Sequence, residues 1–420
     1  MGTEVHGLSL QTIPETVGRL INATPVVDMH THLFSREFGN LGLWGIDELL
    51  TYHYLIAEYF RYSPMRPADF WALPKTRQAE LIWQVVFIDN PPLSEATRGI
   101  LTVLHSLGLD VASRNLASYR DFFRQQTPGD YIDRVLDLAR VKQVVMTNDP
   151  FDPAEREVWL RAPRVDPRFK AVLRLDPLLM KWEEAAAGLS AWGYSVGRPL
   201  DSSTLSEVRR FLEDWVKCMH PVYMAVSLPP SFQFPEDSSR ARLIQECVMP
   251  VCQEHGIPFA MMIGVRKLVN PELRLAGDSL GVADVTVVER MCECFPYNRF
   301  LVTMLSLENQ HALCVAARKF RNLLPFGCWW FLNNPGLVEV ITRMRLELLG
   351  TSFVPQHSDA RVLDQLIYKW AHSRQILAKV LIDKYNDLVR TGWTVTEDSI
   401  QRDVSNLLEG NFRRWIAEAR

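Results

Sequence analysis

The chain has 420 residues, and its 46 Lys and Arg against 49 Asp and Glu give a formal net charge of −3. This balance disfavours a nucleic-acid-binding protein, which needs a basic face toward the phosphate backbone. Hydrophobic residues make up 47% and charged residues 23%, which excludes a disordered or fibrous chain. Apolar runs long enough to span a bilayer, about 18 residues without a charge, are absent from the sequence, so we expect no membrane partner.

The cysteines and the first residues bear on location. The seven cysteines are odd in number and include no CxxC pair, which favours free thiols in a reducing compartment over disulfides or a zinc knuckle. The opening stretch MGTEVHGLSLQTIPE lacks the basic and apolar regions of an export signal. We therefore expect a cytoplasmic protein.

Short apolar runs alternate with helix-length amphipathic segments along the chain. Continuous apolar runs, as opposed to alternating ones, are typical of a buried parallel sheet. Eight runs predict an α/β fold with one (β/α)₈ TIM-like barrel spanning residues 1–420, whose active site lies at the C-terminal ends of the strands. The runs are 26–30, 141–147, 170–175, 222–228, 257–263, 299–305, 324–331 and 351–358.

One connection is much longer than the others. The 110 residues 31–140, rich in aromatics and helix formers, exceed what a connection between a strand and the next strand needs. We interpret them as a large helical insertion after strand 1 that lines the active-site mouth. The last segment, 360–420, is expected to be helical and to cover the outside of the barrel.

Two histidines end the first run, in Asp28-Met29-His30-Thr31-His32. Side chains two apart on a strand project to the same side, so both can bind one divalent metal. By itself an HxH pair is weak evidence, because two surface histidines in a turn explain it as well. Its position at the end of the first strand of a barrel favours the catalytic interpretation.

Asp359 follows the eighth run. In a closed barrel strand eight lies beside strand one, so Asp359 can join His30 and His32 in a site with three protein ligands and open positions. Taken alone, Asp359 would be explained better as the N-cap of the next helix. The combination of the two motifs favours a metal site.

This combination is the mark of the amidohydrolase superfamily, and further pieces resemble the uronate isomerase (glucuronate isomerase) family, of which the chain looks like a divergent member. The matching pieces keep their order over nearly the whole chain. They are Tyr52-His53-Tyr54-Leu55, Ala72-Leu73-Pro74-Lys75-Thr76, 145–152 (VMTNDPFD), Leu173-Arg174-Leu175-Asp176, Ile263-Gly264-Val265-Arg266, Gly327-Cys328-Trp329-Trp330-Phe331 and Ser358-Asp359-Ala360-Arg361.

The resemblance implies a metal-dependent aldose–ketose isomerase acting on a hexuronate, such as glucuronate or galacturonate, through an enediolate. It implies one divalent ion, zinc or manganese, on His30, His32 and Asp359, in an enzyme of carbohydrate catabolism that forms a homo-oligomer. The implied catalytic residues are Asp359, His53, Tyr54 and Arg361. The implied substrate-binding residues are Arg174 and Arg266, which would grip the carboxylate, and Trp329 and Trp330, which would form the pocket wall.

Simpler explanations exist for several of these residues. His53 and Tyr54 could pack inside the insertion, and Arg174 could pair with Asp176. The chain also departs from the family, which has a histidine at the fifth strand and an Asp-His pair at the fourth. Here these places hold Met262, a poor ligand for zinc or manganese, and Ala225-Val226-Ser227.

Two other functions therefore stay open at this point. One is a mononuclear hydrolase or decarboxylase of the amidohydrolase superfamily that acts on another acid. The other is a non-catalytic homologue that binds a sugar acid. The His53-Tyr54 pair with Arg361 favours isomerisation, because these residues suit an enediolate and have no obvious role in amide hydrolysis.

Overall fold

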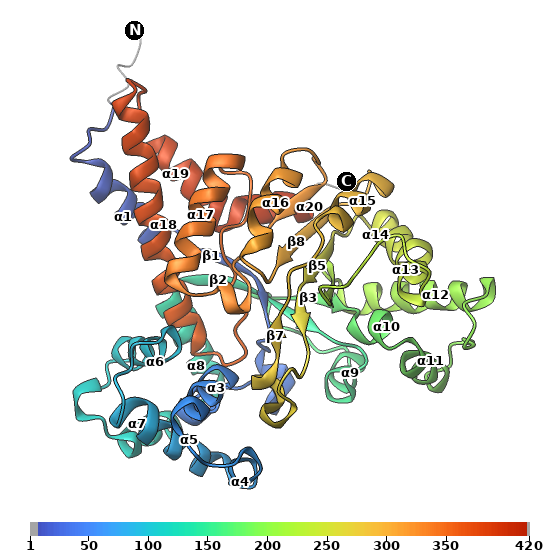
Figure 1. Cartoon of the computed structure of the whole chain (residues 1–420), viewed down its shortest axis with the longest axis horizontal. Helices are drawn as coiled ribbons and strands as arrows, with labels where there is room; N and C mark the ends of the chain where they lie inside the picture. Colours follow the sequence, from blue (N-terminus) through green and yellow to red (C-terminus); the bar gives the residue numbers. More distant parts are fainter. Residues whose placement is uncertain (1–6, 418–420) are drawn as a thin grey trace.

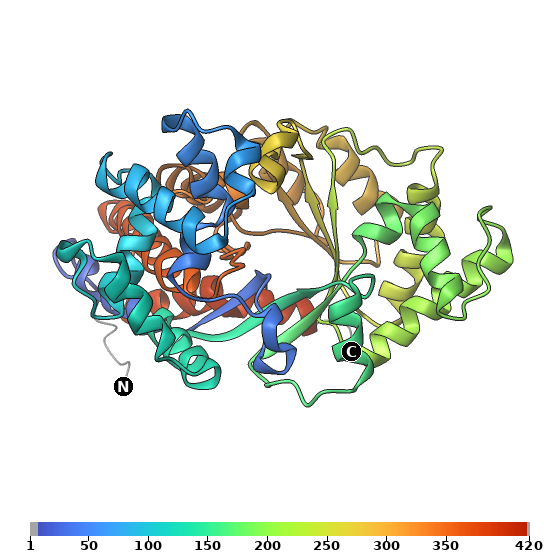
Figure 2. The ribbon, with the colours of Figure 1, turned by 90° about the horizontal axis from the view of Figure 1, so that it is seen from below.

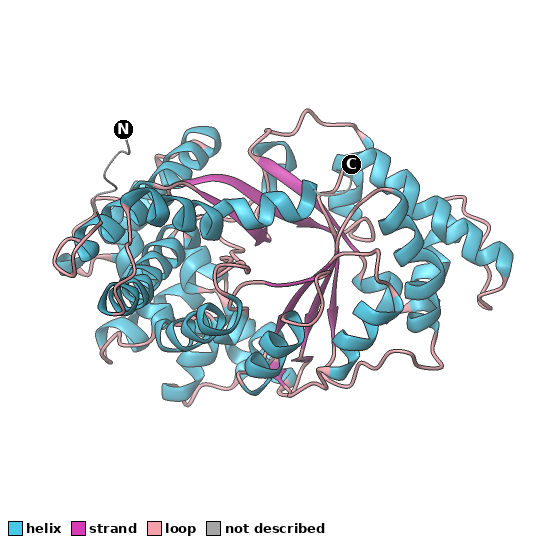
Figure 3. Ribbon diagram, turned by 90° about the horizontal axis from the view of Figure 1, so that it is seen from above, coloured by secondary structure: helices cyan, strands magenta, loops and turns pink. Residues whose placement is uncertain are grey.

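A parallel sheet of seven strands forms the centre of the computed structural model, which describes residues 7–417. The strands lie in the order β1-β2-β3-β4-β5-β8-β9, and the sheet curls so that helices surround its outer face (Figure 3). They are β1 (Val26–Thr31), β2 (Val141–Asn148), β3 (Phe169–Arg174), β4 (Met224–Leu228), β5 (Phe259–Ile263), β8 (Phe300–Met304) and β9 (Leu323–Pro325). These strands match the first seven predicted runs, and continuous burial of β5 and β8 explains their apolar composition.

The eighth predicted run, 351–358, differs from the prediction because it forms no regular strand. It still spans the gap between the two ends of the sheet. The Gly327 amide donates to the Val354 carbonyl at 2.8 Å beside β9, and the Asp359 amide donates to the His30 carbonyl at 3.1 Å beside β1. Pro355 has no N–H to offer a ladder, and Asp359 takes a left-handed φ of 51°. The architecture is an α/β fold consistent with a TIM-like barrel.

Helices fill the long connection between β1 and β2. They gather at the lower left of Figure 1, on one side of the sheet. Their bounds are η1 (Arg36–Leu41), α2 (Ile46–Leu50), α3 (His53–Tyr62), α4 (Pro67–Trp71), α5 (Lys75–Trp83), η2 (Gln84–Ile88), α6 (Glu95–Ser106), η3 (Val111–Ser113), α7 (Leu116–Arg124) and α8 (Pro128–Ala139).

A hairpin leaves the sheet directly after β5. Gly264 has a φ of 126°, and a Cβ there would lie 3.0 Å from the Leu305 Cβ, so only glycine permits this bend. The hairpin consists of β6 (Val265–Arg266), η5 (Pro271–Gly277) and β7 (Ser279–Leu280). Its tip reaches the helices of the long connection, where the Trp71 indole N–H donates to the Glu272 carbonyl at 2.8 Å (Figure 2).

Several of the remaining helices begin at a side-chain cap. The Asp201 carboxylate accepts the Thr204 amide at the start of α12 (Ser202–Met219), and Asp152 caps α9 (Pro153–Leu160) in the same way. The others are α1 (Ile13–Ala23), α10 (Asp176–Met180), α11 (Trp182–Ala191), α13 (Ser239–Leu243), η4 (Ile244–Val248), α14 (Met249–Glu254), α15 (Thr286–Cys294), α16 (Glu308–Ala317), η6 (Trp330–Leu332), α17 (Pro335–Leu349), α18 (Gln365–Arg390), α19 (Glu397–Ser405), η7 (Asn406–Gly410) and α20 (Asn411–Ala417). Within residues 7–417, none of these helices is long and apolar enough to cross a membrane.

Candidate active site

Two histidines and one aspartate meet where β1 ends. The Nε2 atom of His32 lies 3.3 Å from Oδ1 of Asp359, and Nε2 of His30 lies 3.9 Å from the same oxygen. All three donor atoms fall within 4.8 Å of one another. The chain brings them together because the residues after the eighth run hydrogen-bond to the end of β1: the Asp359 amide donates to the His30 carbonyl at 3.1 Å, and the His32 amide donates to the Ala360 carbonyl at 2.7 Å.

The outer nitrogen of each histidine is occupied by a hydrogen bond. His30 Nδ1 lies 2.9 Å from the Tyr223 hydroxyl, and His32 Nδ1 lies 2.9 Å from the Thr147 hydroxyl. Both hydroxyls donate their own proton to a backbone carbonyl: Tyr223 donates to Met29 at 2.7 Å, and Thr147 donates to Thr31 at 3.0 Å. Each hydroxyl therefore accepts N–H from its histidine, which leaves both Nε2 atoms unprotonated and facing Asp359.

The electrostatics of this cluster fit a bound cation. Burial lowers the pKa of His32 to about 4 and that of His30 well below its usual range, so both rings are neutral. Burial raises the pKa of the Asp359 carboxyl, but the positive charge that the adjacent histidine rings would carry if protonated outweighs it and holds this pKa below its usual range, so the carboxylate is ionised while the rings are neutral. The Nε2 atom of His30 and Oδ1 of Asp359 are buried without a hydrogen-bond partner. Facing acceptors with no proton between them need a cation, and two imidazoles with a carboxylate suit a divalent metal.

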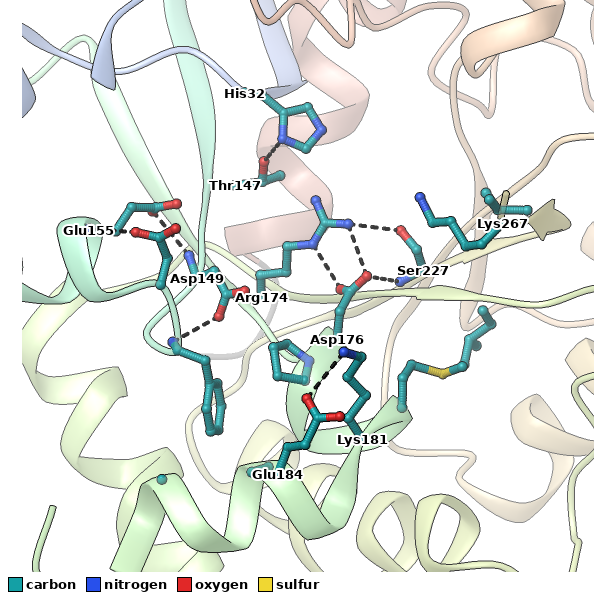
Figure 4. A pocket seen from close by; sticks show the side chains of 18 of the residues that line it. His32, Thr147, Asp149, Glu155, Arg174, Asp176, Lys181, Glu184, Ser227 and Lys267 are labelled. Carbon is teal, nitrogen blue, oxygen red and sulfur yellow. Dashed lines mark hydrogen bonds and ion pairs between the residues drawn. The ribbon is translucent and has the colours of Figure 1, made fainter. Parts of the chain in front are cut away.

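Three cationic side chains line the pocket around this cluster, namely Arg174, Arg361 and Lys267. Arg174 lies between the small pocket that holds the cluster, about 30 Å³, and a cavity of about 830 Å³. Two parallel bonds of 2.8 and 2.9 Å to Asp176 fix its guanidinium, which also donates to the Ser227 hydroxyl at 3.2 Å (Figure 4). The predicted pairing of Arg174 with Asp176 thus exists, yet the guanidinium still lines the site. Arg361 lines both spaces and forms no ion pair within the described part of the chain.

The sequence prediction placed Arg266 here, and the structure does not. Arg266 is exposed and lines none of the cavities described here, whereas its neighbour Lys267 lines both the small pocket and the large cavity. Asp278 holds the Lys267 ammonium at 2.8 Å. Gly264, with its φ of 126°, turns the chain after β5, and beyond this turn Lys267 and not Arg266 lines the pocket.

His53 and Tyr54, from the start of α3, lie on the opposite wall. His53 lines the small pocket together with Trp329 and Trp330, and it also lines a further cavity of about 490 Å³. Both of its ring nitrogens are buried without a partner, and burial and the nearby Arg361 lower its pKa well below the usual range. Tyr54 contacts the His53 ring at 4.5 Å, but its hydroxyl is buried without a partner and it lines neither the small pocket nor the large cavity.

Further residues around the site have no role in the sequence prediction. Tyr52 lines the further cavity beside His53. Lys369 is buried, its ammonium donates to the Ser358 carbonyl next to Asp359, and burial lowers its pKa to about 8. His357 is fully buried beside His30, with ring centroids 5.4 Å apart. A helical lysine such as Lys369 carries no sequence signal that would separate it from a surface residue.

The departures noted in the sequence face the same pocket. Met262 and Ser227 line it at the ends of β5 and β4, so neither strand supplies a metal ligand. Of the three candidate ligands, His30 lies in β1, His32 directly follows β1, and Asp359 directly follows residues 351–358.

A curled parallel sheet with two histidines and an aspartate gathered at its carboxyl edge defines an α/β fold with a candidate metal centre. A uronate isomerase from Bacillus halodurans has a solved structure that is 55% identical to this chain, with a TM-score of 0.96, over 98% of this chain and 97% of that one. This chain belongs to the uronate isomerase family, and it is an enzyme. The predicted family is confirmed, and neither a hydrolase nor a non-catalytic homologue is favoured.

Two more distant structures share the fold. A uronate isomerase from Thermotoga maritima is 15% identical with a TM-score of 0.78, over 98% of each chain. A glucuronate isomerase from Caulobacter crescentus is 12% identical with a TM-score of 0.77, over 100% of this chain and 98% of that one. No protein-family model and no curated protein sequence matches the chain.

Proposed function

We propose that this enzyme interconverts the aldose and ketose forms of a hexuronate, galacturonate or glucuronate, with one zinc or manganese ion held by His30, His32 and Asp359. The observation that carries the proposal is the pair of buried acceptors, His30 Nε2 and Asp359 Oδ1, that face each other without a proton. When bound there, the ion would act as a Lewis acid toward the substrate oxygens.

The reaction moves a proton from C2 to C1 and another from O2 to O1. Asp359 is the candidate base for the carbon-bound proton, because its carboxylate is ionised and its Oδ2 makes no hydrogen bond within the described chain. His53 is neutral with both nitrogens free, so it can accept the proton from one oxygen and donate to the other. The Tyr54 hydroxyl, whose ring contacts His53, extends this path.

The cationic side chains would have two roles, stabilising the enediolate and binding the substrate carboxylate. Arg361, which forms no ion pair within residues 7–417, would stabilise the negative charge of the enediolate. Arg174, fixed by Asp176, would grip the substrate carboxylate, and Lys267 takes the part that the sequence suggested for Arg266. Trp329 and Trp330 would close the wall beside the substrate.

Several wider features belong to the same proposal. Residues 1–420 would form one barrel domain, in which the helices of residues 31–140 line the mouth, as the place of His53 in the pocket wall supports. A cytoplasmic place in sugar-acid catabolism fits the free cysteines of the described chain. Assembly as a homo-oligomer is carried over from the family resemblance.

Proton NMR in D₂O tests the proposal. Metal-loaded protein, with its metal content measured, is incubated with galacturonate and with glucuronate. We expect the C2 proton signal of the aldose to decay and ketose signals to appear. The His32→Ala variant should lose the metal and this activity, while His311→Ala, an exposed histidine on α16, should keep both. An unchanged C2 proton with a full equivalent of zinc or manganese would reject both substrates.

A further inference from the structure

The cavity outside the metal pocket is much larger than a six-carbon acid requires. Its volume of about 830 Å³ is near the top of the range of about 300–1,000 Å³ for pockets that enclose drug-sized ligands. The groups that a hexuronate needs, namely the metal ligands with Arg174, Lys267 and Arg361, all stand at its inner end. The outer part of the cavity, which we call the vestibule, has no role in the reaction proposed above.

The vestibule has a different chemical character from the inner end. Its walls come from the turn after β2 and from α9, α10 and α11 (Figure 4). Asp149, Asp152, Glu155 and Glu184 line it, against the single cation Lys181, which is paired with Glu184 at 3.1 Å. A second anionic group of a ligand would be repelled here, whereas hydroxyl groups would find acceptors.

Two of these carboxyls have an oxygen to spare. Asp149 accepts the Phe151 amide at 2.9 Å through Oδ1, and Glu155 accepts the Asn148 side chain and the Asp149 amide at 3.0 and 3.1 Å through Oε2. Their other oxygens have no partner within the described chain. Burial raises the pKa of Asp149 to about 6 and that of Glu155 to about 7, so near neutral pH the pair can donate as well as accept hydrogen bonds.

Apolar side chains complete the wall. Phe151, Met180 and Trp192 line the vestibule, and the Phe151 and Trp192 rings contact each other at 5.3 Å. The Arg156 guanidinium lies 3.8 Å from the Trp192 ring centroid and holds that ring in place. A preformed wall with apolar faces and hydroxyl-binding carboxylates suits the mixed surface of a sugar ring.

We propose that the vestibule is a subsite for a neutral sugar unit, so that the enzyme also isomerises uronates carrying a neutral glycosyl group on O4. This inference rests on the proposed function. The chemistry is unchanged by the substituent, because a proton still moves from C2 to C1 and another from O2 to O1, and the glycosidic bond stays intact. The uronate unit keeps its free C1 aldehyde and its carboxylate.

A bulky substitution in the vestibule can test its role separately from that of the inner end. Gly188 on α11 lines the vestibule, and a Cβ there would meet only the Trp192 ring at 3.7 Å, an ordinary contact. Gly188→Phe should therefore fold while filling the space. Ala187→Phe is the matched control, because Ala187 is exposed on the same helix and lines none of the cavities described.

Isomerisation of galacturonate, rhamnosyl-(1→4)-galacturonate and digalacturonate is followed by NMR for the three proteins. The wild type should use the rhamnosyl compound with a kcat/KM at least equal to that for galacturonate, and digalacturonate about tenfold less well. Gly188→Phe should lower kcat/KM for the rhamnosyl compound about tenfold and leave galacturonate within about twofold. Ala187→Phe should change neither.

Several results would overturn the inference. These are turnover of galacturonate without turnover of the rhamnosyl compound, an equal effect of Gly188→Phe on both, or equal use of digalacturonate. If no uronate is turned over, the proposed function fails instead. Calorimetric titration of the metal-loaded protein with the rhamnosyl compound then decides the subsite: binding that Gly188→Phe weakens supports it, and no binding rejects it.

Discussion

The two halves of the carboxyl edge of the sheet differ sharply in polarity. On one half, β1, β2 and the eighth segment bury His30, Thr147 and Asp359 in a connected set of contacts. On the other half, β4 and β5 offer Ser227 and Met262 to the same pocket. Because a thioether is a poor ligand for zinc or manganese, a metal ion in this pocket would depend on the first half alone.

The polar half carries a supporting layer of its own. Asp28 is fully buried and accepts the Ser358 amide at 3.0 Å through one oxygen and the Trp370 indole at 2.8 Å through the other. Lys369, one position before Trp370 on α18, donates to the Ser358 carbonyl. Buried charges are tolerated only with such partners, so the polar half is costly to build and the apolar half is not.

The largest expected effect is on protein stability, through the free energy cost of burying the Glu155 carboxylate beside the end of β2. Burial raises the pKa of Glu155 from 4.5 to about 7. Below about pH 4.5, Glu155 is protonated in both the folded and the unfolded protein, and between about pH 4.5 and 7 it ionises only in the unfolded protein. The free energy by which the buried carboxyl destabilises the fold is therefore absent at low pH and complete above pH 7. Glu155→Gln should stabilise the protein by about 3 kcal/mol at pH 8 and by little at pH 4.5.

Urea unfolding at the two pH values measures this difference. Gln keeps an acceptor for the Asn148 side chain and the Asp149 amide, so the variant tests charge alone. Glu157→Gln, at an exposed residue of the same helix, is the control and should show no such trend. A pH-independent difference would mean that Glu155 ionises in the folded protein as it does in water.

The next effect concerns the orientation of a metal ligand. Thr147→Val removes the hydroxyl that accepts the His32 Nδ1–H and fixes its tautomer. We expect metal affinity to fall about 10- to 100-fold, with the fold intact. Competition with a chelator measures the affinity, and circular dichroism checks the fold. Thr147→Ser keeps the hydroxyl and should recover most of the affinity, whereas equal loss in both variants would contradict the tautomer argument.

The sequence predicted what depends on local pattern. Seven apolar runs became strands because buried parallel strands need no alternation, and His30 and His32 share a side because a strand repeats every two residues. It could not predict Tyr223 and Thr147 as partners of the histidines, since these contacts join residues far apart in the chain. The family resemblance implied Arg266 as a substrate-binding residue, and the turn at Gly264 that brings Lys267 to the pocket instead could not be read from the sequence pattern.

Substitutions at Lys267 and Arg266 test which of these two neighbouring residues binds the substrate carboxylate. Lys267→Met should raise the KM for galacturonate about tenfold with a smaller change in kcat, because under the proposed function the ammonium would bind the substrate in its ground state as well as in the transition state. Arg266→Met should change KM less than twofold, since Arg266 is exposed and lines none of the cavities described. Steady-state kinetics decide between them, and the reverse order would return the carboxylate grip to Arg266.

The smallest effect is expected on the apolar half, at Met262. Met262→Leu conserves volume in a position that is 2% exposed, so stability should change by less than about 1.5 kcal/mol. Since the ion depends on β1 and the eighth segment, metal affinity and kcat/KM should stay within about threefold of wild type. Chelator competition and isomerase kinetics on the same preparation measure both. A loss of more than about tenfold in either would mean that the sulfur contacts the ion or the substrate, and the contrast between the two halves would not hold.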